Sequence, residues 1–191
     1  MDTAHTQARR PTRRNAGFTL PELLVVMAVV AVLLALAVPS FGAMADTVRL
    51  NALQSDLLAH LQLARSEAIK RAGRVALCKS ADKRSCAAAG GWEQGWIVFF
   101  DANNNGARDA GETLIRSGDG SVRGLLASGN QNVARYISFD RDGEARTVSG
   151  AFQAGTITMC RESAGVAGAR QIVINAFGRP RTQKSTVASC A

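Results

Sequence analysis

Residues 17–38 read GFTLPELLVVMAVVAVLLALAV, and this stretch decides what kind of fold the chain adopts. From Leu23 to Val38 it holds no charged or strongly polar side chain, but Glu22 places one carboxylate directly before the apolar run. Residues 9–15, RRPTRRN, put four arginines ahead of it. The sequence therefore predicts a long apolar helix with a basic segment before it and a single acid at its start.

Three interpretations of this stretch compete. A secretory signal would be cut after an A-x-A-like site at residues 43–45, which leaves a mature terminus near Asp46. A simple membrane anchor would need about 20 apolar residues, and the sixteen from Leu23 to Val38 approach that length only with their flanks. Neither interpretation explains Glu22, because a carboxylate in the hydrocarbon layer costs about 2.5–3.5 kcal/mol unless it is paired or near the interface.

The third interpretation accounts for the acid. Residues 17–41, GFTLPELLVVMAVVAVLLALAVPSF, resemble the type III signal of type IV pilins and type II secretion pseudopilins. The resemblance implies that a prepilin peptidase/methyltransferase cuts between Gly17 and Phe18 and methylates the new Phe18 amine. It also implies that Glu22 is an assembly contact, which pairs with this amine of a neighbouring subunit. Pro21 departs from the aliphatic residue usual in major pilins, but proline is tolerated in the first turn of a helix.

Beyond Pro39 the sequence predicts an amphipathic helix followed by short strands. Apolar residues recur mostly in steps of three and four at Val48, Leu53, Leu57, Leu61, Ala64 and Ala68. This spacing predicts a helix to about Arg71, where Gly73 stops it. Residues 80–91 and 118–132 are predicted as loops. Strands are predicted at Val75–Lys79, Trp96–Phe100, Thr113–Ser117, Ala134–Phe139, Thr156–Cys160 and Gln171–Ala176.

The predicted fold is α+β and pilin-like, with one long helix whose second half packs on an antiparallel sheet. Residues 1–17 are the cleaved leader, and residues 18–45 are the transmembrane and filament-core helix. Residues 46–73 continue that helix, and residues 74–191 form a β-rich periplasmic domain. The arginines predict a cytoplasmic amino end, so the chain is expected to cross the bacterial inner membrane once.

The tryptophan-containing middle of the chain carries a second resemblance. Residues 92–112, WEQGWIVFFDANNNGARDAGE, together with a late FGR at residues 177–179, resemble the body of GspH/FimT-type minor pilins and pseudopilins. The resemblance implies a subunit at or near the tip of a type IV pilus or a type II secretion pseudopilus. Its partners would be other pilin or pseudopilin subunits and an inner-membrane assembly platform. Both tryptophans are predicted to lie in the core.

Charge and cysteine content add two expectations. The formal net charge is +8, and without residues 1–17 the chain keeps 19 basic and 14 acidic side chains, or +5. A moderately basic body permits an anionic partner. Four cysteines in an exported domain predict two disulfides, for which three pairings exist. We favour the pairing that joins near neighbours, Cys78 with Cys86 and Cys160 with Cys190.

The stretch DANNNGARDAGE, residues 101–112, matches the spacing of a calcium-binding EF-hand loop. Its oxygen ligands would come from Asp101, Asn103, Asn105, Asp109 and Glu112, with the Ala107 carbonyl between them. The flanking segments resemble strands instead of helices. A polar hairpin turn, in which asparagine and glycine supply the left-handed backbone, explains the same residues. Calcium is therefore one of two interpretations, and otherwise no cofactor is expected.

The carboxyl-terminal residues are basic, because no acid follows Glu162. Residues 178–181, GRPR, match the GRxR motif that FimT-type minor pilins of DNA-uptake pili carry in a carboxyl-terminal loop. The resemblance implies that Arg179, Arg181 and Lys184 contact the phosphates of double-stranded DNA, with salt-sensitive and sequence-independent binding. A Cys160–Cys190 disulfide would hold this loop against the preceding strand. The alternatives are a solvated loop and a purely structural initiator subunit of the secretion system.

Catalysis is not expected. The two histidines are His5 in the leader and His60, which is predicted to lie on the surface of the helix. The sequence shows no phosphate-binding glycine loop after a strand, no metal-spaced cysteine and histidine cluster, and no nucleophile with a base nearby. We therefore predict that the protein is not an enzyme.

Overall fold

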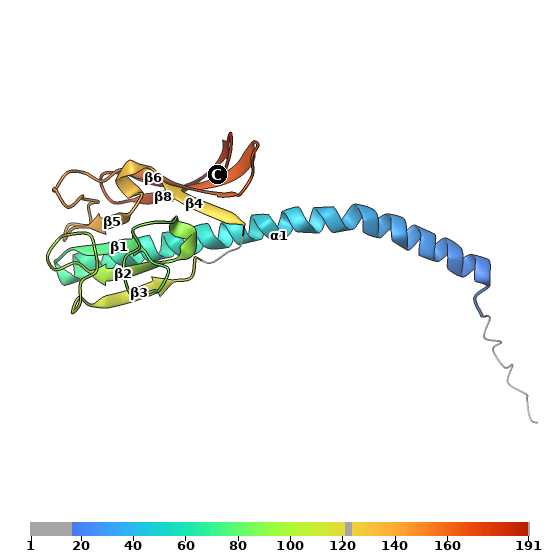
Figure 1. Ribbon diagram of the computed structural model, residues 1–191, viewed down its shortest axis with the longest axis horizontal. Coiled ribbons are helices and arrows are strands. Elements are labelled where there is room, and N and C mark those ends of the chain that lie inside the picture. The colour runs from blue at the N-terminus through green and yellow to red at the C-terminus, as the bar shows by residue number, and fades with distance from the viewer. Residues whose placement is uncertain (1–16, 121–123, 191) are drawn as a thin grey trace, which may run out of the picture. The chain divides into compact units, whose positions relative to one another are not determined.

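The computed structural model describes residues 17–120 and 124–190, without the side chains of residues 36–41 and 43. The predicted leader lies outside this part of the chain except for Gly17. The chain forms two compact units, Met1–Ala43 and Met44–Ala191. Helix α1, Leu20–Arg71, contributes to both units and confirms the single long helix that the sequence predicts (Figure 1).

The end of α1 differs in one detail from the prediction. The left-handed residue that ends the helix is Ala72, with φ at 49°, and Gly73 follows it. The N–H of Ala72 bonds to the Ile69 carbonyl at 3.2 Å, and the N–H of Gly73 bonds to Ala68 at 3.2 Å. This is a Schellman motif. Gly73 is needed for space, because a Cβ there would lie 2.7 Å from the Phe100 ring.

The β-strands form two antiparallel four-stranded sheets, where a single sheet was expected. The first sheet has the order β3-β2-β1-β5, and the second has the order β4-β6-β7-β8. The first contains β1 Val75–Lys79, β2 Trp96–Phe100, β3 Leu114–Gly118 and β5 Tyr136–Phe139. The second contains β4 Leu125–Gly129, β6 Gly155–Arg161, β7 Ala167–Ile174 and β8 Pro180–Val187.

Two segments that were predicted as loops are strands. β4 lies inside the predicted loop 118–132 and pairs with β6. β8 lies where a basic carboxyl-terminal loop was predicted, and it pairs with β7 over its whole length. Each is at an edge of the second sheet. Edge strands need no apolar alternation, and β8 reads PRTQKSTV, so periodicity gives no signal there.

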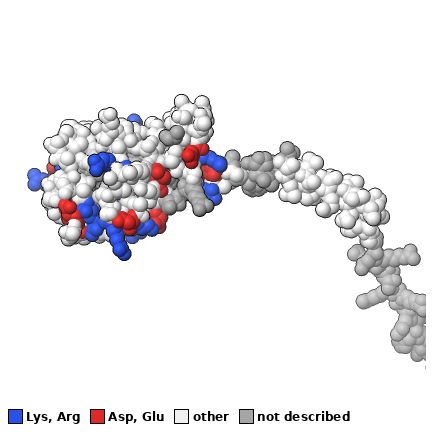
Figure 2. Space-filling model, in the orientation of Figure 1, with Lys and Arg blue, Asp and Glu red and all other residues white. Residues whose placement is uncertain are grey.

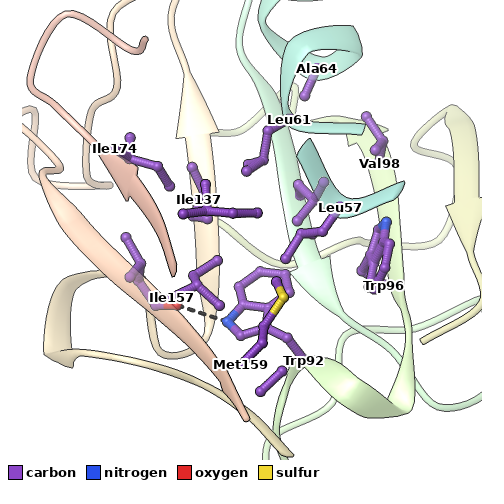
Figure 3. Packing of buried hydrophobic residues seen from close by; sticks show 14 of the residues in the cluster. Leu57, Leu61, Ala64, Trp92, Trp96, Val98, Ile137, Ile157, Met159 and Ile174 are labelled. Atoms are coloured by element: carbon purple, nitrogen blue, oxygen red, sulfur yellow. Dashed lines mark hydrogen bonds between the residues drawn. The ribbon is translucent and has the colours of Figure 1, made fainter. Parts of the chain in front are cut away.

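The core lies between α1 and both sheets (Figure 3). The buried stripe of α1 begins at Leu50, whereas Val48 is 57% exposed and is not part of it. Both tryptophans are fully buried, which confirms that they pack in the core. The indole N–H of Trp92 donates to the Val133 carbonyl at 3.0 Å. Burying a leucine or isoleucine contributes about 1.5–3 kcal/mol. The helix contributes Leu50, Leu53, Leu57, Leu61, Ala64 and Ala68.

His60 is buried, so the prediction of a surface position was wrong. Its side of α1 faces β2, where the imidazole packs edge-on against Trp96 with ring centroids 5.7 Å apart. Its Nδ1 lies 2.8 Å from the Asp56 carbonyl one turn earlier. The residue is 8% exposed, so it is not available to solvent as a catalytic base.

Polar contacts tie the second sheet to α1, and each sheet carries one disulfide. Gln54 of α1 donates to the Gln171 carbonyl of β7 at 2.9 Å. Arg170 of β7 donates to the Asn51 side chain at 2.8 Å. The disulfides Cys78–Cys86 and Cys160–Cys190 are the pairing that the sequence favours. The second one ties the chain just beyond β8 to β6.

Candidate processing site, assembly contact and nucleic-acid surface

The bond between Gly17 and Phe18 is exposed and precedes the helix. Gly17, Phe18 and Thr19 are outside regular secondary structure, and α1 begins at the next residue. Phe18 is 81% exposed, and no atom lies within 4 Å of a Cβ built at Gly17. A peptidase could therefore reach this bond without unwinding a helix.

Glu22 lies in the first turn of α1 and faces back toward the chain start. The N–H of Leu23 bonds to the Thr19 carbonyl at 3.1 Å, which makes Thr19 the N-cap. The Glu22 carboxylate accepts a long 3.5 Å bond from the N–H of Thr19, which is half of a capping box. Pro21 removes an N–H that would have no partner within the helix. The carboxylate is exposed and favoured by the helix dipole.

The first half of α1 is apolar on all sides. Every large apolar side chain described from Leu20 to Leu34 is exposed by 41–74%. A helix that is apolar all round needs a covering of lipid or of other helices. Within the residues whose side chains are described, no helix is long and apolar enough to cross a membrane.

Residues 101–112 form a polar loop between β2 and β3 that is closed by its own hydrogen bonds. Asp101 is 1% exposed, and its two oxygens accept N–H bonds from Asn105 at 3.0 Å and Gly106 at 2.9 Å. Burial raises the pKa of Asp101 against the effect of these bonds. The two oxygens of Glu112 accept N–H bonds from Ala102 at 2.8 Å and Asp109 at 3.1 Å.

The asparagines of this loop are oriented as donors toward an acid. The side-chain amides of Asn103 and Asn105 donate to the same oxygen of Asp109, at 2.7 and 2.8 Å. Over the described ranges, no three His, Cys, Asp or Glu side chains are grouped so that they could hold a metal ion. The geometry is that of a self-closed turn, and calcium binding stays one of the two interpretations.

The GRPR residues lie in the turn between β7 and β8 and at the start of β8, not in a long loop. Arg179 ends the turn, where its N–H bonds to the Asn175 side chain at 2.9 Å. Arg181 and Lys184 lie within β8, opposite Val173 and Arg170 of β7. All three side chains of the predicted DNA site are exposed. None makes an ion pair with an acid in the described part of the chain.

The strand geometry separates the predicted DNA-binding residues. Side chains alternate between faces along a strand, so Arg181 and Lys184 point to opposite sides of the sheet. The register adds Arg170, which was not among the predicted site residues, because it lies directly across from Lys184. Only the pairing of the two strands reveals this neighbour. On the face in view in Figure 2, acidic and basic side chains are intermixed, so a binding surface would depend on such local groupings.

Comparison with known sequences places the chain in a family. The sequence model of the type II transport protein GspH matches residues 54–178, which is most of the chain. The chain belongs to the GspH family. A second match, the prokaryotic N-terminal methylation motif, covers residues 12–38. A comparison with curated proteins found no match.

Solved structures similar to this GspH-family chain are minor pilins and pseudopilins. The type IV minor pilin FimU of Pseudomonas aeruginosa, in crystals of space group P21, has a TM-score of 0.57 at 23% identity. The match covers 78% of this chain and 99% of FimU. FimU in space group P65 gives 0.52 at 23% identity, over 74% and 100% of the two chains. The minor pseudopilin EpsH of the Vibrio cholerae type 2 secretion system gives 0.40 at 14% identity, over 69% and 93%.

Membership of the GspH family and the N-terminal methylation motif identify a pilin-like subunit, and the likeness to FimU confirms the pilin-like α+β fold. The methylation motif covers Gly17, Phe18 and Glu22, the residues that were predicted for processing and assembly. Other pilin subunits and a prepilin peptidase are the partners that such a GspH-family subunit implies.

Proposed function

We propose that this protein is a minor subunit of a type IV pilus, incorporated at or near the tip after cleavage between Gly17 and Phe18. The observation that supports this proposal is the exposed Glu22 carboxylate at the start of a helix whose first half is apolar on every side. The fold likeness to FimU favours a pilus over a secretion pseudopilus. Before assembly, the subunit is anchored in the inner membrane with its carboxyl-terminal domain in the periplasm. An inner-membrane assembly platform then incorporates it into the filament.

Cleavage supplies a cationic partner that Glu22 lacks among the residues that the structure describes. The new Phe18 amine stays positively charged after methylation. In the apolar centre of a filament, the amine of one subunit would pair with the Glu22 carboxylate of its neighbour. Leaving either charge buried alone would cost about 3–5 kcal/mol. The pair therefore selects one stagger between neighbouring helices.

The mature amino terminus tests this proposal. The protein is produced with a prepilin peptidase, and intact-mass measurement is expected to show a chain that begins at methylated Phe18. A Gly17→Leu variant should stay uncut. A Glu22→Gln variant should be cut but left out of filaments, while Glu67→Gln, which removes an acid from the last turns of the same helix, should assemble. A mature terminus near Asp46 would refute the anchor and the assembly contact together.

A second candidate function, binding of double-stranded DNA, is favoured by the β7–β8 hairpin. From Ser163 to the end of the chain there are four basic side chains and no acid. Exposed arginine and lysine side chains without acidic partners are free to neutralise phosphates. The hairpin offers no row of aromatic rings for base stacking, so binding would be weak and independent of sequence.

The test uses residues 44–191, the compact unit that contains the entire described core. Fluorescence anisotropy with a short duplex is expected to show binding that weakens steeply between 50 and 200 mM salt. An Arg179→Ala/Arg181→Ala double variant should bind the duplex more weakly. Equal binding by both proteins, or none by either, would leave the structural role of the subunit as its function.

A further inference from the structure

The basic residues of the hairpin do not form one surface, and the register shows which of them belong together. In β7, Ile172 and Ile174 are buried against α1. Their partners across the ladder are Thr182 and Pro180 of β8. Pro180 therefore lies on the α1-facing side of the hairpin, and so does Lys184, an even number of residues further along. Arg181 lies on the outer side, opposite Val173.

A hollow of about 280 Å³ lies where this side of the hairpin meets α1. It holds two arginines from distant parts of the chain, Arg65 and Arg179, and no acidic side chain. Two further polar side chains of the helix, from Gln62 and Ser66, open into it. An anion in this hollow would meet two guanidinium groups and no carboxylate. Its lining is Gln62, Arg65, Ser66, Ile69, Arg179 and Pro180.

Contacts at Gly143 hold the Arg65 side chain and the hairpin turn that precedes Arg179 on the same segment. The Nε of Arg65 donates to the Gly143 carbonyl at 2.9 Å, and its two Nη groups have no hydrogen-bond partner among the described residues. The hairpin turn packs on the same segment, since a Cβ at Gly178 would lie 2.2 Å from the Gly143 oxygen. Paired guanidinium groups with free N–H forks match the oxygens of a phosphate.

A second pair of cations continues this side of the hairpin. Arg170 and Lys184 lie directly opposite each other, and like charges in that position are destabilising unless an anion lies between them. Arg170 is held by Asn51 of α1, and Lys184 has no acidic partner among the described residues. The four residue steps from Pro180 to Lys184 span about 13 Å of strand, which is long enough to follow several phosphates.

The acids nearby lie on a different hollow. Asp142 and Glu144 line a neighbouring hollow of about 420 Å³, which also contains Arg65 and Arg179. Glu144 is already paired with Arg146, and Asp142 lies 4.0 Å from Arg141. A polyanion therefore fits better along the acid-free hollow and the α1-facing side of β8.

We propose that the DNA backbone binds along the α1-facing side of the β7–β8 hairpin, with phosphates at Arg65/Arg179 and at Arg170/Lys184. Arg181, although part of the GRPR motif, faces away from this path. The inference rests on the proposed DNA-binding function and adds a helix residue to the site. It predicts that a residue outside the motif contributes more than one inside it.

The experiment compares single variants that each remove one positive charge. Binding of a short duplex to residues 44–191 is measured from 50 to 200 mM salt for Arg65→Gln, Lys184→Gln and Arg181→Gln. Each lost phosphate contact lowers the slope of log affinity against log salt by about 0.9. We expect that loss for Arg65→Gln and Lys184→Gln, and a much smaller change for Arg181→Gln, the matched control.

A further variant separates contact from folding. Ser66→Glu puts an acid into the hollow without touching the Arg65–Gly143 bond, and it should weaken binding at least as much as Arg65→Gln. If Arg181→Gln loses the most, or if all variants weaken binding equally, this path is wrong while DNA binding stands. If the unmodified protein binds no DNA at 50 mM salt, both proposals fail. Displacement of DNA by polyglutamate at equal charge would assign the surface to an acidic protein and overturn the inference.

Discussion

Removing the two disulfides one at a time tests how the β-rich unit is stabilised. Cys160 and Cys190 are 30 residues apart in sequence, whereas Cys78 and Cys86 are 8 apart. If cross-links act mainly by restricting the unfolded chain, these separations correspond to about 3.6 and about 2.5 kcal/mol of stability. Replacement of each pair by alanine avoids burying a new hydroxyl group at positions that are largely enclosed.

Urea unfolding of residues 44–191 and of both double-alanine variants measures these losses. The Cys160→Ala/Cys190→Ala variant should lose about 1 kcal/mol more than the Cys78→Ala/Cys86→Ala variant. The loss should also be local, because Cys190 forms the bridge with Ser163 that holds the chain beyond β8. Amide hydrogen exchange should therefore accelerate in β8 and little in β1. A larger loss for the Cys78–Cys86 pair, or unchanged protection of β8, would refute the reasoning.

Three further predictions concern the helix end and two loops. Ala72→Gly should raise the free energy of unfolding by about 0.5–1 kcal/mol in urea, because a left-handed alanine is strained. Hydrogen bonds from Ser85, and then from the Arg84 N–H, hold the pKa of Asp82 well below its usual range. Because the pKa of Asp82 is lower in the folded than in the unfolded protein, ionised Asp82 stabilises the folded state. Asp82→Asn should therefore lower the free energy of unfolding fully at pH 7, and this loss should shrink below about pH 4. The melting temperature of residues 44–191 should be the same in calcium as in a chelator, because the 101–112 loop is closed by its own hydrogen bonds. A higher melting temperature in calcium would establish a calcium site in this loop.

The sequence predicts the elements that carry a strong apolar pattern. The helix to Arg71 and the strands β1 and β2 have the predicted bounds, because dense apolar residues end sharply at glycine or polar segments. The predictions for Val48 and His60 were wrong because the buried stripe of α1 follows the position of each residue around the helix, not its polarity. His60 lies three residues after Leu57 and four before Ala64, which places it on the buried stripe despite its polarity.

Of the two strands that escaped prediction, β4 buries Leu125 and Ala127 in the core, whereas β8 has no buried side chain and is stabilised by its pairing with β7. β8 carries polar residues on both of its faces and shows no apolar alternation. Its sequence alone therefore cannot distinguish this strand from a loop. The same limit applies to the candidate DNA site. Arg65 and Arg179 are far apart in sequence, and they meet only because the turn at Gly178 packs on Gly143. No local motif contains that contact.

The separation of Arg181 from Lys184 gives the GRPR residues two different physical tasks. β8 is an edge strand, and proline and charged side chains on an edge prevent pairing with another chain. Pro180 at the start of β8 and Arg181 on its outer face protect this edge whether or not the protein binds a ligand. Edge protection needs a charged side chain on the strand, but it does not require that the side chain point to one particular side of the sheet. Phosphate binding sets a stricter condition, because the basic side chains that contact one DNA backbone must lie on the same side of the sheet. Arg179, Lys184 and the helix residue Arg65 satisfy that condition, so the motif alone overstates Arg181 and omits Arg65.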